Sequence, residues 1–98
     1  MSIEDIIDTL SKVINKGTFI LHKSLSINQK FKAYKTFYYD LYYRNDNKST
    51  LVLSYNDTKN VSSNDIDEAW KVYDKIYLEI LIKWILTDEY KKVLDGIQ

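Results

Sequence analysis

Tyrosine is the residue type whose number and spacing carry most of the chemical information in this chain of 98 residues. Nine residues are tyrosine, and Tyr34, Tyr38 and Tyr42 recur at every fourth position. Positions an even number apart share one face of a strand, which rises about 7 Å for every two residues, so the three rings would stand in one row. Each ring offers a large, rigid contact surface with a hydroxyl group at its tip. The spacing therefore predicts a binding surface.

Polar and charged neighbours extend this predicted surface. Asp40 and Arg44 share the face of the tyrosine row, and residues 45–48 follow as a hairpin turn, because Asn and Asp tolerate positive φ. An alternative stays open, since tyrosine favours strands and a row of tyrosines can simply stabilise a sheet. The residues predicted to contact a partner are Tyr34, Tyr38, Asp40, Tyr42, Arg44, Asn45, Asp46 and Lys48.

Residues suited to catalysis or metal binding are few. His22 is the one histidine of the chain, and there is no cysteine. Asp40 has no second acid or base beside it in the sequence with which to divide the roles of general acid and base. The chain also lacks a glycine-rich phosphate loop, a nucleophile elbow and the spacing of metal ligands. We therefore predict no enzymatic activity, no cofactor and no metal ion.

A helix followed by strands must position these residues. Apolar residues recur at steps of three and four from Ile3 to Ile14, which predicts one amphipathic helix. Ser2 and Asp5 have the spacing of a capping box at its start, and Gly17 is expected to end it in the left-handed conformation.

The spacing of apolar residues changes to two after Thr18, which predicts three strands. The first begins at Thr18, the second covers residues 32–44 and the third covers residues 49–55. Residues 56–60 are expected to form a loop. In the third strand, Leu51, Leu53 and Tyr55 are predicted to share one face and Thr50, Val52 and Ser54 the other.

The last third of the chain has a helical pattern with Ser62 as its predicted N-cap. The pattern widens between Ile76 and Leu86, where apolar residues occur nearly all round the helix. A break near Thr87 is an open alternative to one continuous helix. The tyrosines predicted to face inward are Tyr39, Tyr43, Tyr73 and Tyr77. The fold class is α+β: an N-terminal helix, a three-stranded antiparallel meander and a long C-terminal helix, in one domain covering residues 1–98.

The charges are balanced in total but not along the chain. Lys and Arg number 14, as do Asp and Glu. Residues 16–48 hold seven basic and two acidic residues, whereas residues 62–98 hold five and eight. The first residues resemble no signal peptide, and no apolar segment is long enough to cross a membrane, so a cytoplasmic location is expected.

The order α-β-β-β-α, with an additional short helix at the end, in about ninety residues without cysteine resembles that of small anti-CRISPR proteins encoded by phages. This resemblance covers most of the chain as an order of elements and carries over no individual residue. It implies a phage or mobile-element protein that binds and disables a host defence protein, such as a CRISPR–Cas effector, in the cytoplasm of a bacterium. We therefore expect a protein-binding inhibitor.

Two other functions remain open. Single-stranded nucleic acid could stack on the tyrosine row beside Lys32, Lys35 and Arg44. The double-stranded-RNA-binding domain shares the element order, but the acidic segment 63–68 stands where that family has phosphate-binding lysines. A self-associating module is the third possibility, as a homodimer through the helix from Ile76 to Leu86.

Overall fold

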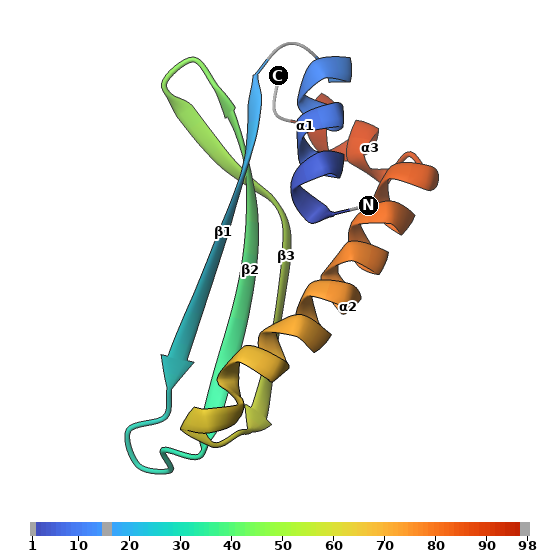
Figure 1. Ribbon diagram of the computed structural model, residues 1–98. Helices are drawn as coiled ribbons and strands as arrows, with labels where there is room; N and C mark the ends of the chain where they lie inside the picture. Colours follow the sequence, from blue (N-terminus) through green and yellow to red (C-terminus); the bar gives the residue numbers. More distant parts are fainter. Residues whose placement is uncertain (1, 15–16, 97–98) are drawn as a thin grey trace.

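The computed structural model describes residues 2–14 and 17–96 and shows one helix, three strands and two further helices (Figure 1). This α+β order confirms the predicted fold class. Of the two alternatives left open for the C-terminal segment, the structure has the break near Thr87. The elements are α1 (Ile3–Ile14), β1 (Thr18–Ile27), β2 (Tyr34–Asn45), β3 (Lys48–Asn60), the 3₁₀ turn η1 (Ser63–Asp65), α2 (Ile66–Leu86) and α3 (Glu89–Asp95).

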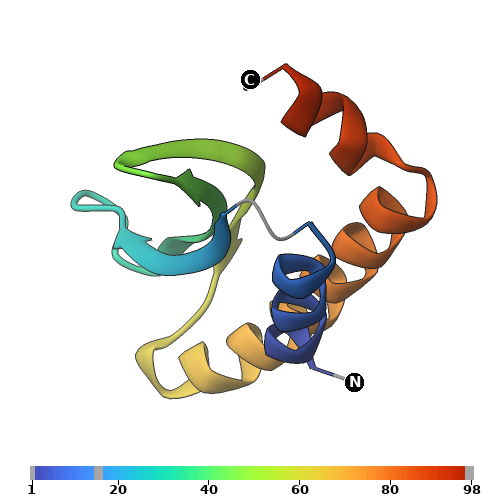
Figure 2. The same cartoon turned by 90° about the horizontal axis from the view of Figure 1, so that it is seen from above.

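The three strands form an antiparallel meander in the order β1-β2-β3, with the helices on one side of it (Figures 1 and 2). Burial along β2 alternates strictly, because successive side chains of a strand point to opposite faces. Phe37, Tyr39, Leu41 and Tyr43 are buried toward the helices. The odd-numbered face of β2 therefore forms the sheet side of the core, as the sequence predicts.

Aromatic side chains join β2 to α2. The Phe37 ring lies 4.8 Å, between centroids, from both Trp70 and Tyr73, and Tyr39 stacks on Tyr77 at 4.8 Å with an 18° angle between the rings. Such pairs stabilise a fold by about 0.5–1.5 kcal/mol beyond the free energy gained from burying their surfaces. The predicted inward tyrosines thus form much of the contact that fixes α2 on the sheet.

The predicted capping box of α1 is present. The amide of Asp5 donates to the Ser2 hydroxyl at 3.1 Å, and the amide of Ser2 donates to the Asp5 carboxylate at 3.3 Å. The prediction for Gly17 is wrong, because its φ is not positive. Glycine is required there by space: a Cβ atom would lie 2.3 Å from the carbonyl oxygen of Arg44 and 2.8 Å from the Tyr43 ring.

We expect Gly17→Ala to lower the free energy of unfolding by about 1–3 kcal/mol, because the added methyl group meets backbone that must move. Gly96→Ala is the matched control, since its Cβ would lie 3.5 Å from the Val93 carbonyl oxygen, an ordinary contact distance, and its φ is −73°. Denaturant unfolding of the two variants measures the difference. Equal stabilities would contradict the packing role of Gly17.

The loop predicted at residues 56–60 is wrong. These residues extend β3, and Asn56–Asn60 pairs with residues 38–34 of β2. Asn and Asp disfavour strands, but the pairing with β2 satisfies their peptide groups. β2 in turn begins at Tyr34 and not at residue 32. Phe31 lies in the preceding loop with 57% of its surface exposed.

A β-bulge in β3 overturns the predicted facing of Leu51. Leu41 pairs with Leu53, but the next residue, Tyr42, pairs with Leu51, so that Val52 is the extra residue. Leu53 lies opposite core residue Leu41 and packs against the core, and Val52 is buried beside it. Leu51 lies on the opposite face and is 48% exposed.

The C-terminal segment differs from one continuous helix with Ser62 as its N-cap. The Ser62 hydroxyl donates to the Asp65 carboxylate at 2.8 Å and makes no hydrogen bond to a backbone amide, so the predicted N-cap bond is absent. α2 ends at Leu86, and Asp88, with φ of 58°, turns the chain into α3. Among the residues that the structure describes, no helix is long and apolar enough to span a membrane.

Candidate functional site: the open face of the sheet

The even-numbered side chains of β2 lie on the face opposite the buried, odd-numbered ones that pack toward the helices. Within the ranges that the structure describes, no helix covers it. We call this surface the open face. The predicted residues that share it are Tyr34, Tyr38, Asp40, Tyr42 and Arg44, in that order along one strand.

The tyrosines of the open face differ in exposure. Tyr34, the first residue of β2, is 46% exposed, whereas Tyr38 and Tyr42 are half-buried. Because β2 is the middle strand, residues of β1 and β3 flank both half-buried rings. The rings are therefore held in place by the sheet while part of each remains accessible.

The β2–β3 hairpin extends the open face beyond Arg44. Asn45 pairs with Lys48, and Asp46 has the positive φ of 56° that such a tight turn requires. Arg44, Asn45, Asp46 and Lys48 are all exposed. The structure thus brings every predicted contact residue to one strand face or to the hairpin that continues it.

Residues from all three strands form rows across the open face. One row consists of His22, Asp40 and Ser54, because both neighbours pair with Asp40. A nucleophilic relay needs histidine between the acid and the serine, whereas here the carboxylate lies in the middle. The row therefore lacks the order by which histidine activates a serine.

The rows beyond Asp40 are polar. Ser24, Tyr38 and Asn56 form one row, and the hydroxyl groups of Thr36 and Thr58 lie 2.8 Å apart in the next. Hydroxyl and amide groups of this kind both donate and accept hydrogen bonds. This part of the open face offers polar contacts around the central tyrosine ring.

Two open-face residues were missed as contact residues by sequence reasoning. Ile20 and Leu51 flank Tyr42 on its two sides and are 43% and 48% exposed. Side chains alternate along a strand, so Ile20 lies on the face opposite the buried Phe19. No signal in one strand reveals Leu51, because the bulge is a property of the pairing of two strands.

A hydrogen-bonded network on the helix side holds the sheet under α2. Lys23 forms an ion pair with Asp74 at 2.8 Å, and its ammonium group lies 4.9 Å from the Trp70 ring centroid. The Tyr39 hydroxyl donates to the same carboxylate. Burial, followed by this hydrogen bond, raises the pKa of Tyr39 above its ordinary value.

Two tyrosines of α2 form hydrogen bonds with β3. The Tyr73 hydroxyl donates to Asp57 at 2.5 Å, and the Tyr77 hydroxyl donates to the carbonyl oxygen of Leu53 at 3.2 Å. Burial is the main reason that the pKa values of Tyr73 and Tyr77 are raised. These tyrosines belong to the core of the fold, in contrast to those of the open face.

The buried residue Lys35 fastens the far end of the sheet. Its side chain is on the inward face of β2 and is 3% exposed. The ammonium group donates to the backbone oxygen of Lys32 at 3.0 Å and to that of Val61. Lys35 therefore links the loop before β2 to the segment that leads into α2, and it is not available for nucleic acid as the sequence suggested.

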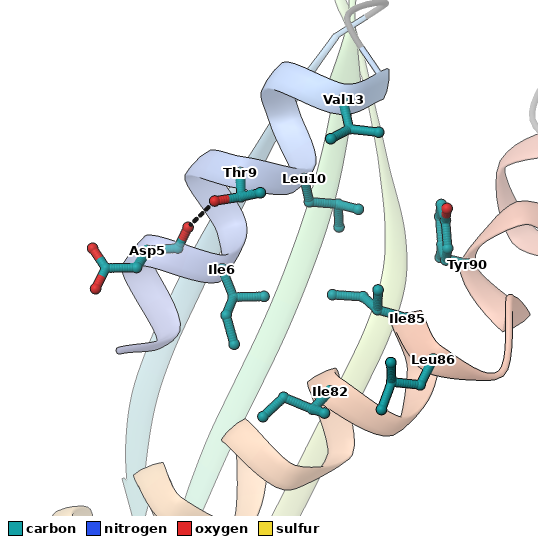
Figure 3. A pocket seen from close by; sticks show the side chains of 9 residues that line it. All are labelled: Asp5, Ile6, Thr9, Leu10, Val13, Ile82, Ile85, Leu86 and Tyr90. Atoms are coloured by element: carbon teal, nitrogen blue, oxygen red, sulfur yellow. Dashed lines mark hydrogen bonds between the residues drawn. The ribbon is translucent and has the colours of Figure 1, made fainter. Parts of the chain in front are cut away.

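An apolar groove of about 460 Å³ lies between α1 and the C-terminal helices (Figure 3). Val13 and Leu86, at its margins, are 70% and 77% exposed, and the carboxylate of Asp5 points away from the groove. Ile82 and Ile85 are partly buried and pack against the hydrophobic core. Part of the wide apolar surface between residues 76 and 86 is thus covered within the chain.

No group of three or more His, Asp or Glu side chains in residues 2–14 and 17–96 is placed to hold a metal ion. Comparisons of the chain with protein-family models, with curated proteins and with solved structures find no match.

Proposed function

We propose that this chain is a small protein-binding inhibitor or adaptor that engages its partner through the open face and catalyses no reaction. The observation that carries the proposal is the asymmetry of the sheet. One face packs against helices, while the other presents a tyrosine row, exposed aliphatic side chains and a charged hairpin. Tyrosine, with its rigid ring and polar tip, is enriched at protein interfaces.

The more specific form of this proposal is that the partner is a host defence protein, such as a CRISPR–Cas effector, in the cytoplasm of a bacterium. It rests on the order of elements alone. A protection assay tests it: phage or plasmid survival is measured in cells with an active defence system, with and without this chain. Survival that does not depend on the chain in any defended strain would contradict it.

We expect the double variant Tyr38→Ala, Tyr42→Ala to bind its partner at least about thirtyfold more weakly, because interface tyrosines at hot spots contribute about 2 kcal/mol or more. The partner is first captured from the host, identified, purified and then titrated against the wild-type chain. Tyr90→Ala is the matched control, since Tyr90 is also half-buried but lies on α3, on the helix side. Thermal unfolding checks that the variants fold.

Unchanged affinity in the double variant, together with a loss in Tyr90→Ala, would move the interface to the helices and contradict the proposal. Binding to single-stranded oligonucleotides is the competing function of the same face. A gel shift at low and at high salt tests it, because phosphate contacts weaken steeply as salt rises.

Self-association is a second candidate, and the exposed Val13 and Leu86 beside the groove favour it. Light scattering at tens of micromolar distinguishes a dimer from a monomer. If the chain is a dimer through this groove, Leu86→Ser would convert it to a monomer and leave the open face unchanged.

A further inference from the structure

The open face has an apolar centre that crosses all three strands. Ile20 on β1 and Leu51 on β3 are the direct neighbours of Tyr42 on β2. We call these three residues the anchor row. The bulge at Val52 is what turns Leu51 outward, since an uninterrupted β3 would place a different residue beside Tyr42. The row therefore exposes two aliphatic side chains beside a half-buried aromatic ring.

Charges of opposite sign lie on the two sides of the anchor row. Asp40 precedes Tyr42 by two residues and Arg44 follows it by two, which places them about 7 Å away along the strand in each direction. On the hairpin beyond Arg44, Lys48 adds a second positive charge and Asp46 a negative one. Among the described residues, neither Asp40 nor Arg44 has an ion-pair partner. Arg44 is exposed and Asp40 is half-buried, so a binding partner can reach part of each charged side chain.

We propose that the open face recognises a protein segment with an apolar side chain between a basic and an acidic one. This inference rests on the proposed protein-binding function and specifies the partner's chemistry. The apolar side chain packs on the anchor row, the basic one lies toward Asp40 and the acidic one toward Arg44. The two charges of the partner are about 13 Å apart, the distance of four strand residues. A nucleic acid fits less well, because its uniform negative charge would meet Asp40.

A library of random twelve-residue peptides displayed on phage, with the intact chain as bait, tests this inference. Leu51→Ser serves as the counter-bait. We expect enriched peptides to contain an apolar residue between a basic and an acidic residue. Synthetic copies should bind Leu51→Ser at least about tenfold more weakly than the wild-type chain, as expected when a central contact is removed. Val72→Ser is the matched control, because Val72 is similarly exposed, at 51%, but lies on α2.

A charge exchange gives the second measurement. Asp40→Lys should weaken peptide binding, and changing the basic residue of the peptide to glutamate should restore it. Arg44→Glu should respond in the same way to a peptide with its acidic residue changed to lysine. Amide chemical shifts of Ile20, Tyr42 and Leu51 should move when the peptide is added.

The possible failures are distinguishable. Peptides that bind Leu51→Ser and Asp40→Lys as well as the wild-type chain, but lose affinity when Tyr34 or Tyr38 is replaced, would overturn this inference and retain the open face as the binding site. Peptides insensitive to every open-face substitution would overturn both proposals. Failure to enrich any peptide over the counter-bait would also overturn the inference.

Discussion

The protein is expected to unfold cooperatively as the pH rises above about 10, because buried tyrosines must stay protonated for the fold to persist. Tyr39, Tyr73 and Tyr77 have raised pKa values and are at most 3% exposed. A tyrosine whose pKa is higher in the folded chain contributes its full stabilisation below the unfolded value. That contribution is lost as the pH rises toward the folded value.

The effect is large because several tyrosines act together. Each can remove up to about 1.4 kcal/mol per pH unit, so the three remove about 4 kcal/mol per unit. Tyr43 and Tyr55, whose pKa values burial also raises, act in the same direction. A domain with only about 5–15 kcal/mol of stability should therefore begin to unfold above about pH 11.

Phenolate absorbance and circular dichroism, followed together against pH, test this expectation. The phenolate signal of the buried tyrosines should rise only as the helical signal is lost. Tyr73→Phe removes one titrating group, so stability should fall less steeply with pH. If all nine tyrosines ionised near pH 10 with the helical signal intact, the expectation would be wrong.

Tyr77→Ala is expected to cost about 3–5 kcal/mol of the free energy of unfolding, as is usual when a fully buried ring is removed. Tyr77 has no exposed surface, and it both stacks on Tyr39 and bonds to β3. The substitution removes the ring that joins α2 to two strands. Much of the stability of a domain of this size would be lost.

Tyr77→Phe is the control for this variant. It keeps the stacked ring and loses the hydrogen bond to the Leu53 carbonyl, so we expect a cost of about 1 kcal/mol. Denaturant titration of both variants gives the two values. Equal costs would show that the hydroxyl group, and not the packing of the ring, is what matters at this position.

The alternation of apolar residues in strands and their spacing in helices predicted the parts of the fold that depend on a single element. The inward set Phe37, Tyr39, Leu41 and Tyr43 follows from a period of two, because a strand buried on one face must alternate. The stripe of α2, with Tyr73 and Tyr77, follows from a period of 3.6 in the same way. The side of β2 that carries the tyrosine row was therefore predictable.

The features that could not be predicted depend on contacts between elements. Asn56–Asn60 has the composition of a loop, but its pairing with β2 makes it a strand. The role of Gly17 depends on the approach of the Arg44 backbone, which is distant in sequence. Leu51 became part of the open face through a bulge that only the register of two strands defines.

The candidate site shows the same division. Its central strand was predictable, but the rows across it were not, because a row is defined by which residue of β1 and β3 lies opposite each residue of β2. His22 beside Asp40 is one example, and Ile20 beside Tyr42 is another. The chemistry of the anchor row arises from this register.

Side chains of the helices also form hydrogen bonds with backbone groups of both outer strands. The Ser11 hydroxyl of α1 accepts from the amide of Phe19 on β1, and the Tyr77 hydroxyl donates to the carbonyl of Leu53 on β3. Lys23 adds an inward-pointing charge to β1. Open sheet edges recruit further strands, and coverage by helices and inward charges both oppose this. The chain thus carries its own protection against growth into strand-paired aggregates while one broad face of its sheet stays accessible.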